Sequence, residues 1–387
     1  MKQIPKLFIL LLLLAGSSCK NSKSGKSQQE NLPEEGWYLD AEKFRSTIDG
    51  KETDLYRLSN ESGMEVYVTN YGAVIPALLV PDRDGNHGDI VLGFDNVERY
   101  TADGDPNFGN VPGRYANRID GGKFELDGTV YELPINDTRN QNQLHGGTEG
   151  FMEQVWETIE ATENSVELKL VSPDGQMGYP GTVTVYVRYT VTVDNTLEID
   201  YKATTDAPTV LNVTQHSYFN LKGEGNGNIL DHKIMLNADS YTPVNERMIP
   251  TGEVLSVEGT PMDFRTPTKI GERIDSDFDQ LVMGNGYDHN WVINSEGGLA
   301  VAATAYDETT GRFMEVLTTE PGVQLYCGNF LDGTLASKSG GIYEHRGGFC
   351  LETQHYPDSP NHPNFPSTVL RPGEEFNSKT VFKFYVK

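Results

Sequence analysis

The sequence contains little cysteine, which limits the kinds of stabilisation and metal chemistry it can use. Only three cysteines occur in 387 residues. Cys327 and Cys350 are too far apart for recognised metal-ligand spacing, and a single pair is not a disulfide scaffold. We therefore exclude a cysteine-based metal site. We expect two buried free thiols in strands, with a bridge between them as the alternative.

Basic residues are also scarce. Lys and Arg number 31 against 56 Asp and Glu, so the net charge is −25. A chain this acidic repels polyanions, which argues against nucleic acid and against anionic membrane surfaces as partners. The excess of acidic side chains is in itself sufficient to explain solubility.

Long apolar runs are absent except at the N-terminus. Lys2 and Lys6 precede an apolar run at residues 7–15, and small residues then lead to Cys19. This order predicts a lipoprotein-type signal peptide over residues 1–18, with Cys19 as the lipid-modified first residue. The run is too short to span a bilayer. We therefore expect an exported cell-envelope lipoprotein, on the periplasmic side or the cell surface, held to the membrane only through Cys19.

Helix-like periodicity is missing, whereas strand and hairpin patterns recur. Residues 19–36 are almost free of apolar side chains and predict a flexible tether. Residues 182–202 alternate with period 2 around an Asp-Asn turn, and residues 124–133 form a hairpin pattern around Asp127-Gly128. The sequence predicts an all-β protein, with one large antiparallel β-sandwich over residues 37–387. Short helical turns are expected only near residues 97–100 and 270–274.

The segment over residues 212–220 has an unusual distribution of polar residues. In an extended strand its even positions share one face, and all five of those positions carry hydrogen-bonding side chains. Such a face is unsuited to a core and typical of the floor of a polar cleft. The residues on this face are Asn212, Thr214, His216, Tyr218 and Asn220.

Glu352 lies inside an apolar strand-like run and is expected to be buried. Burial of a carboxylate is costly unless it is paired or functional, and it raises the pKa toward the range of a useful base. A structural ion pair is the alternative explanation. The cluster His355, Asp358 and His362 has no recognised metal-ligand spacing, and we assign no metal ligands.

Ten segments, in order along the chain, resemble the aldose 1-epimerase (galactose mutarotase) family. Each is a weak signal alone, but their number and order make the resemblance specific, and it covers nearly the whole chain after the tether. The segments are Asn70-Tyr-Gly-Ala73, Asp89-Ile-Val-Leu-Gly-Phe94, Gly113-Arg-Tyr-Ala-Asn-Arg-Ile119, Leu144-His-Gly-Gly147, Gly150-Phe with Trp156, Thr214-Gln-His-Ser-Tyr-Phe-Asn-Leu221, Ile249-Pro-Thr-Gly-Glu253, Tyr287-Asp-His-Asn290, Pro321-Gly-Val-Gln-Leu-Tyr326 with Asn329-Phe-Leu-Asp-Gly333, and Leu351-Glu-Thr-Gln-His-Tyr-Pro357.

The resemblance implies a mutarotase-like supersandwich that interconverts the α and β anomers of free hexoses such as glucose and galactose. His216 matches the family's general acid and Glu352 its general base. The matched sugar-binding positions are Asn117, Arg118, His145, Tyr218, Asp288 and Gln324. The reference pKa values of about 6.5 for His and 4.3 for Glu would leave the acid protonated while the base is ionised.

The implied reaction is a pair of proton transfers, so no cofactor is required for catalysis, although a structural calcium ion is possible. We expect a monomer whose partner is a small aldose. Three alternatives remain. A non-catalytic sugar-binding lipoprotein would not need the acid–base pair. A sugar-phosphate epimerase would need a basic cluster, and a glycosidase would use two carboxylates, such as Asp288 and Glu352.

Overall fold

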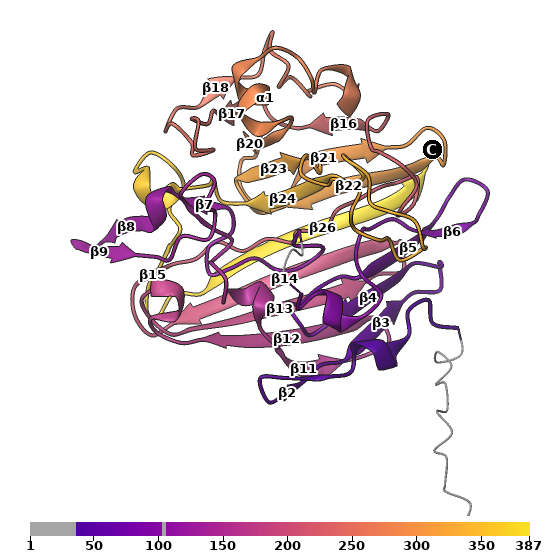
Figure 1. The fold of residues 1–387 in the computed structure, drawn as a ribbon, viewed down its shortest axis with the longest axis horizontal. Coiled ribbons are helices and arrows are strands. Elements are labelled where there is room, and N and C mark those ends of the chain that lie inside the picture. Colours follow the sequence, from indigo (N-terminus) through magenta and orange to yellow (C-terminus); the bar gives the residue numbers. More distant parts are fainter. Residues whose placement is uncertain (1–35, 103–105) are drawn as a thin grey trace, which may run out of the picture. The chain divides into compact units, whose positions relative to one another are not determined.

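The computed structural model describes residues 36–102 and 106–387, which are dominated by antiparallel strands (Figure 1). The predicted signal peptide (1–18), Cys19 and nearly all of the predicted tether lie outside the described residues. In the two described ranges, no helix has the length and apolar character needed to cross a membrane.

The largest sheet has nine strands and supplies one wall of the core. Its strands alternate between buried and more exposed residues, most regularly in β13, because successive side chains of a strand point to opposite faces. In spatial order the strands are β11 (Glu157–Ala161), β12 (Ser165–Ser172), β13 (Val183–Val191), β14 (Thr196–Thr205), β26 (Phe376–Val386), β22 (Arg312–Thr318), β21 (Ala300–Tyr306), β16 (Lys233–Leu236) and β19 (Thr268–Lys269).

Two smaller antiparallel sheets supply further walls. Every residue of β23 and of β24 in the five-stranded sheet is buried. The five strands in order are β18 (Leu255–Ser256), β17 (Ser240–Thr242), β20 (Asp288–Val292), β23 (Gly322–Tyr326) and β24 (Cys350–Gln354). The four-stranded sheet contains β3 (Leu55–Ser59), β4 (Glu65–Thr69), β5 (Ala77–Pro81) and β6 (His87–Asp89).

Short strand pairs and single turns lie outside these three sheets. The pairs are β1 (Thr47–Ile48) with β2 (Lys51–Glu52), β7 (Arg118–Ile119) with β10 (Gln143–Leu144), β8 (Lys123–Leu126) with β9 (Thr129–Glu132), and β15 (Thr209–Val210) with β25 (Val369–Leu370). The helical elements are α1 (Asp279–Gly284) and the 3₁₀ turns η1 (Ala41–Phe44), η2 (Val97–Arg99), η3 (Asp120–Gly122), η4 (Phe151–Glu153), η5 (Gln176–Gly178), η6 (Ile270–Glu272) and η7 (Ser359–Asn361).

A single hydrophobic cluster joins the inward faces of the three larger sheets. It includes Val187 and Ile199 from the nine-stranded sheet, Val66 from the four-stranded sheet, and Leu325 and Leu351 from the five-stranded sheet. Each such side chain contributes roughly 1.5–3 kcal/mol when fully removed from water. All described residues belong to one compact unit, Pro33–Lys387.

The predicted antiparallel β architecture is confirmed, and so are the hairpins around Asp127-Gly128 and Asp194-Asn195. Helix α1 was not predicted. It is shorter than two turns and is capped by Asn285 in the left-handed region, so it leaves no periodic pattern. Cys327 and Cys350 are free and buried, as expected.

Candidate active site

A cavity of about 190 Å³ brings together polar side chains from distant parts of the chain. Seven of the eight residues predicted to act on or bind a sugar line it, and the eighth, Gln324, binds one of them from behind. The lining residues are Pro106, Asn107, Asn117, Arg118, Leu144, His145, His216, Tyr218, Asp288, Tyr326, Phe330 and Glu352.

The short pair β7–β10 positions three of these side chains. Leu144 pairs with Arg118, which places Asn117 and His145 next to each other just beyond the strand ends. The two residues are joined reciprocally: His145 N donates to Asn117 O at 3.0 Å, and Asn117 N donates to His145 Nδ1 at 3.1 Å. Both have positive φ, a conformation that Asn and His tolerate better than most residues.

The five-stranded sheet presents the carboxylates. Asp288 on β20 and Glu352 on β24 flank β23, where Gln324 pairs directly with Glu352. Gln324 Nε2 donates to Asp288 Oδ1 at 2.7 Å. Arg118 Nη2 donates to Asp288 Oδ2 at 3.3 Å, so this buried carboxylate is held on both oxygens.

The segment 212–220 reaches the site, but not as the regular strand predicted from the sequence. Its only β contacts in the described structure are isolated bridges at Asn212 and Phe219. His216 and Tyr218 line the cavity, whereas the side-chain amides of Asn212 and Asn220 donate to backbone carbonyls. The prediction of a five-residue polar cleft floor is therefore wrong beyond these two side chains. The asparagine side chains at the two ends of the segment instead donate hydrogen bonds to carbonyls of the irregular backbone.

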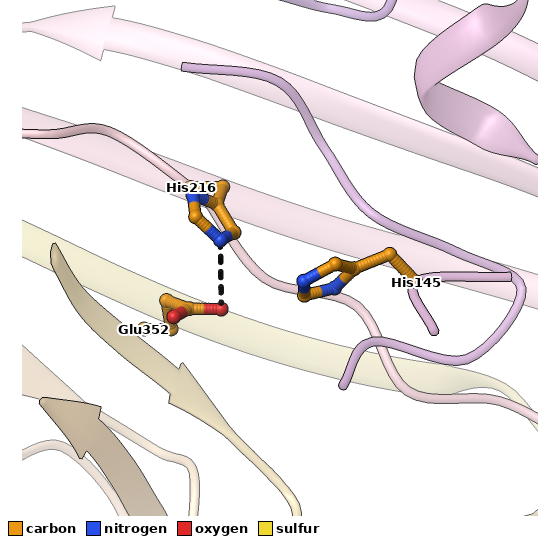
Figure 2. A group of neighbouring side chains, drawn as sticks. All are labelled: His145, His216 and Glu352. Atoms are coloured by element: carbon orange, nitrogen blue, oxygen red, sulfur yellow. Dashed lines mark ion pairs between the residues drawn. The ribbon is translucent and has the colours of Figure 1, made fainter. Parts of the chain in front are cut away.

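His216 and Glu352 face each other at the centre of the site (Figure 2). Nε2 of His216 lies 3.6 Å from Oε2 of Glu352, and both side chains are almost fully buried. Burial lowers the pKa of His216 to about 4. Burial, together with the nearby Asp288 charge, raises the pKa of Glu352 to about 8.

These pKa values reverse the order expected from the reference values. In the empty site both groups favour their neutral forms near neutral pH, because the cavity penalises an imidazolium and a carboxylate alike. The pair then carries one proton on Glu352. Transfer of that proton to Nε2 gives the ion pair without changing the number of protons in the site.

His145 is held as a neutral hydrogen-bond donor. Burial lowers its pKa well below the ordinary value, and the neighbouring His216 and Arg118 lower it further. Because its Nδ1 accepts the Asn117 amide proton, the ring proton of neutral His145 resides on Nε2. His145, His216 and Glu352 place their ligand-type atoms within 4.8 Å of one another, but in this tautomer His145 offers no free lone pair to a cation.

Three residues in or beside the cavity were not predicted. Asp137, from the loop after β9, lies 3.5 Å from Arg118 Nε, and Tyr326 and Phe330 stack at the cavity wall. The Asn-Asp-Thr-Arg sequence around Asp137 is an ordinary polar loop, so only the fold assigns it to Arg118. Trp291 is a fully buried core residue, and His355 pairs with Glu320.

Comparison with known proteins identifies the family. The family model described as "Aldose 1-epimerase" matches residues 54–383. The chain belongs to the aldose 1-epimerase family. Galactose mutarotase from Rattus norvegicus is 45% identical over 337 residues, which cover 87% of this chain and 95% of the rat protein. Aldose 1-epimerase from Escherichia coli K12 is 39% identical, with coverage of 87% and 96%.

Solved structures of aldose 1-epimerase homologues have the same fold. A GalM/aldose epimerase homologue from C. elegans superposes with a TM-score of 0.79 at 28% identity, covering 86% of this chain and 99% of the homologue. Galactose 1-epimerase from Lactobacillus acidophilus gives a TM-score of 0.76 at 31% identity, with coverage of 88% and 97%. The predicted mutarotase-like supersandwich is confirmed.

The localisation predicted from the N-terminal pattern is wrong. The curated relatives at 45–46% identity include galactose mutarotases of rat, cattle and human, and these are not envelope lipoproteins. The prediction rested on a short compositional pattern at residues 1–19, which lies outside both the family match and the described residues.

Proposed function

We propose that this protein interconverts the α and β anomers of free hexoses, with Glu352 as general base and His216 as general acid. It is an isomerase of the aldose 1-epimerase family. The observation that carries the assignment of roles is the buried Glu352–His216 pair, whose facing atoms lie 3.6 Å apart in a sugar-sized polar cavity. Anomerisation needs a base and an acid on two oxygens of one carbon, and this pair is close enough to serve both.

The reaction opens the pyranose ring by two proton transfers. Glu352 takes the proton from the C1 hydroxyl while His216 gives the Nε2 proton to the ring oxygen, and the bond between C1 and the ring oxygen breaks. Rotation about the C1–C2 bond turns the aldehyde over. His216 then removes the proton from the C5 hydroxyl, Glu352 returns its proton to the carbonyl oxygen, and the other anomer forms.

The proton count in the site stays constant throughout this cycle. One proton shared by Glu352 and His216 is sufficient for opening and closing, whichever group holds it at rest. Arg118 favours the ionised form of Glu352, because its positive charge lowers the pKa of that carboxyl. Asp288 favours the imidazolium, because its negative charge raises the pKa of His216. Arg118 therefore favours the carboxylate of the ion pair and Asp288 favours its imidazolium, while Asp288 also raises the pKa of Glu352 and so opposes ionisation of the base.

The remaining cavity residues hold the sugar. Arg118 and the Nε2–H of His145 donate to oxygens near the reacting carbon, and Asp288 accepts from sugar hydroxyls with its geometry fixed by Gln324. Tyr218 packs its ring against His216 with centroids 5.2 Å apart, while its hydroxyl donates to Pro106 O. Asn117 is tied to the backbone through Oδ1, which leaves its amide protons for the substrate.

The mechanism requires no metal ion and no redox cofactor, since every step is a proton transfer between side chains and sugar oxygens. Incubation with a chelator should therefore leave the turnover rate unchanged. A chelator-dependent loss of thermal stability that calcium restores would instead indicate a structural calcium ion.

Polarimetry on freshly dissolved α-D-galactose and α-D-glucose tests the proposal. Optical rotation should relax faster in proportion to the wild-type protein. Glu352→Gln and His216→Ala should each slow turnover by about 10²–10⁴-fold, the usual contribution of a general acid or base. Glu296→Gln, at an exposed position, is the matched control. Wild-type rates in both site variants would overturn the roles, and sugar binding without turnover in the wild type would favour a non-catalytic binding protein.

A further inference from the structure

Cys350 contacts the ring nitrogen of His216 that points away from Glu352. Its Sγ lies 3.7 Å from His216 Nδ1, within hydrogen-bond distance for sulfur, and the thiol is fully buried. Cys350 begins β24 and precedes Glu352 by two residues, so both side chains leave the strand on the same face. One strand therefore reaches both ring nitrogens of His216, with a sulfur on Nδ1 and a carboxyl group on Nε2.

The proposed reaction imposes a requirement on Nδ1. When His216 gives its Nε2 proton to the ring oxygen, the neutral ring that remains must carry its proton on Nδ1. The Nε2 lone pair must then stay directed at the open sugar in order to take the proton back. The opposite tautomer would place a proton on Nε2 and leave the ring unable to close the sugar. The partner of Nδ1 must therefore accept a hydrogen bond through the whole cycle.

We propose that Cys350 is a positioning residue for this reaction: its sulfur accepts the Nδ1–H of His216 and keeps the exchangeable proton site on Nε2. The inference rests on the proposed function and specifies how His216 performs it. The backbone carbonyl of His216 accepts the Gly109 amide proton at 3.0 Å and also favours the protonated ring, so among the described side chains the Cys350 sulfur is the acceptor in reach of Nδ1. The rings of His145 and Tyr218 pack on other sides of the imidazole, with centroids 5.1 and 5.2 Å away.

The choice of sulfur has a chemical consequence. A carboxylate at Nδ1, as in a Ser-His-Asp triad, strongly stabilises the imidazolium. A thiol is only a weak acceptor, so it fixes the ring without greatly stabilising its positive charge. Burial raises the pKa of the Cys350 thiol well above its ordinary value, so the sulfur stays neutral. His216 consequently remains a strong acid toward the weakly basic ring oxygen.

Variants of Cys350 separate this role from packing. In Cys350→Ala, Nδ1 loses its side-chain acceptor, and kcat should fall about 10- to 100-fold, part of the usual 10²–10⁴-fold contribution of a general acid, with KM nearly unchanged. Cys350→Ser keeps an acceptor and should restore most of kcat. Because a hydroxyl oxygen accepts more strongly than sulfur, the acidic limb of the pH–rate profile should move to higher pH in this variant.

Cys327→Ala is the matched control, since Cys327 is also a fully buried free thiol and lies one residue beyond β23. It should lose similar packing but retain the wild-type kcat, pH profile and His216 tautomer. Wild-type kcat and an unshifted pH profile in Cys350→Ala would overturn the proposal, as would an equal loss of kcat in Cys327→Ala.

The ¹⁵N NMR signals of the His216 ring test the inference independently of turnover. At a pH where the ring is neutral, wild-type His216 should give a protonated Nδ1 and an unprotonated Nε2. Cys350→Ala should shift the population toward the other tautomer, and Cys350→Ser should not. An unchanged tautomer in Cys350→Ala refutes the positioning role even if the enzyme is an active mutarotase. A tautomer shift in a protein without mutarotase activity would instead refute the proposed function.

Discussion

Gln324 on β23 donates a hydrogen bond of 2.7 Å to Asp288 on the neighbouring strand β20. Gln324 does not line the cavity itself, but this bond fixes the orientation of a carboxylate that does. The same Gln324 lies opposite Glu352 on its other side. β23 therefore separates the two buried carboxylates and binds one of them. A neutral amide in this position holds Asp288 for sugar hydroxyls without adding charge beside the proposed base.

Replacement of Gln324 by Leu should weaken sugar binding more than proton transfer. Asp288 would lose one hydrogen bond and keep only Arg118, so its orientation would be less defined. We expect KM for galactose to rise about tenfold, equivalent to about 1.4 kcal/mol, with a smaller change in kcat. Initial-rate polarimetry over a range of sugar concentrations separates the two constants.

Gln354→Leu is the control for that experiment. Gln354 is also buried, two residues after Glu352 on β24, but its side-chain amide has no hydrogen-bond partner within residues 36–102 and 106–387. Its replacement should leave KM unchanged and should not destabilise the protein, because no bond is lost. Equal effects of the two substitutions on KM would show that the Gln324–Asp288 bond is not what matters.

The pH dependence of kcat/KM should be bell-shaped. Below a pH of about 4 His216 gains a proton while Glu352 keeps its own, so the pair holds two protons and lacks a base. Above about 8 the pair loses its last proton and lacks an acid. Activity should fall about tenfold per pH unit beyond each limb, and the limbs belong to the pair and not to single residues. Spontaneous mutarotation, measured at each pH without enzyme, is subtracted. A profile that stays flat from pH 3 to 10 contradicts the assignment.

The sequence predicts the sheets better than it predicts the relations within the site. Regular alternation in β13 and β14, with an Asp-Asn turn between them, is sufficient to predict that hairpin. Glu352 is predictable as a functional residue because it interrupts an apolar run. The bond between Gln324 and Asp288 depends on strand register, and the contact of Asp137 with Arg118 depends on a loop crossing to β7. Neither relationship leaves a periodic signal.

The protonation order of the acid–base pair was also beyond the sequence. Reference pKa values favour protonated His216 and ionised Glu352, and the opposite order results from burial of both groups. The extent of burial depends on the packing of β24 against segment 212–220, whose backbone is irregular although its sequence predicts a strand. A residue type is readable from sequence, whereas its solvation is a property of the fold.

Glu352→Gln should stabilise the protein at alkaline pH while slowing turnover by about 10²–10⁴-fold. The pKa of Glu352 rises from its usual 4.5 to about 8 on folding, so its contribution favours the native state fully below pH 4.5 and is lost as pH rises through 8. Ionising the carboxyl in the folded protein costs on the order of 5 kcal/mol at most. Denaturant unfolding at pH 5 and pH 9 should show Glu352→Gln gaining about 1–3 kcal/mol relative to wild type at the higher pH. Exposed Glu296→Gln should show no such gain, and a wild-type pH dependence in Glu352→Gln would refute the argument.

Mutation of two arginines in one motif should affect different properties, stability for Arg114 and activity for Arg118. Arg114 is buried, and its guanidinium donates to the backbone carbonyls of Ser172, Pro173, Pro180 and Gly181, whereas Arg118 lines the cavity. Burial lowers the pKa of Arg114 to about 10, and its stabilising role rests on several hydrogen bonds in a fixed fork geometry. Arg114→Lys should lose most of these bonds and reduce the free energy of unfolding by about 2–4 kcal/mol, with kcat of the remaining folded enzyme nearly unchanged.

Arg118→Lys keeps the charge in the cavity but loses the paired contacts to Asp137 and Asp288. It should lower kcat/KM about 10- to 100-fold, while changing the free energy of unfolding less than Arg114→Lys does, because it leaves a cation beside both carboxylates. Unfolding curves and initial rates of both variants, measured at one pH near 6, give the comparison. The separation fails if Arg114→Lys loses activity at full stability, or if Arg118→Lys unfolds as readily as Arg114→Lys.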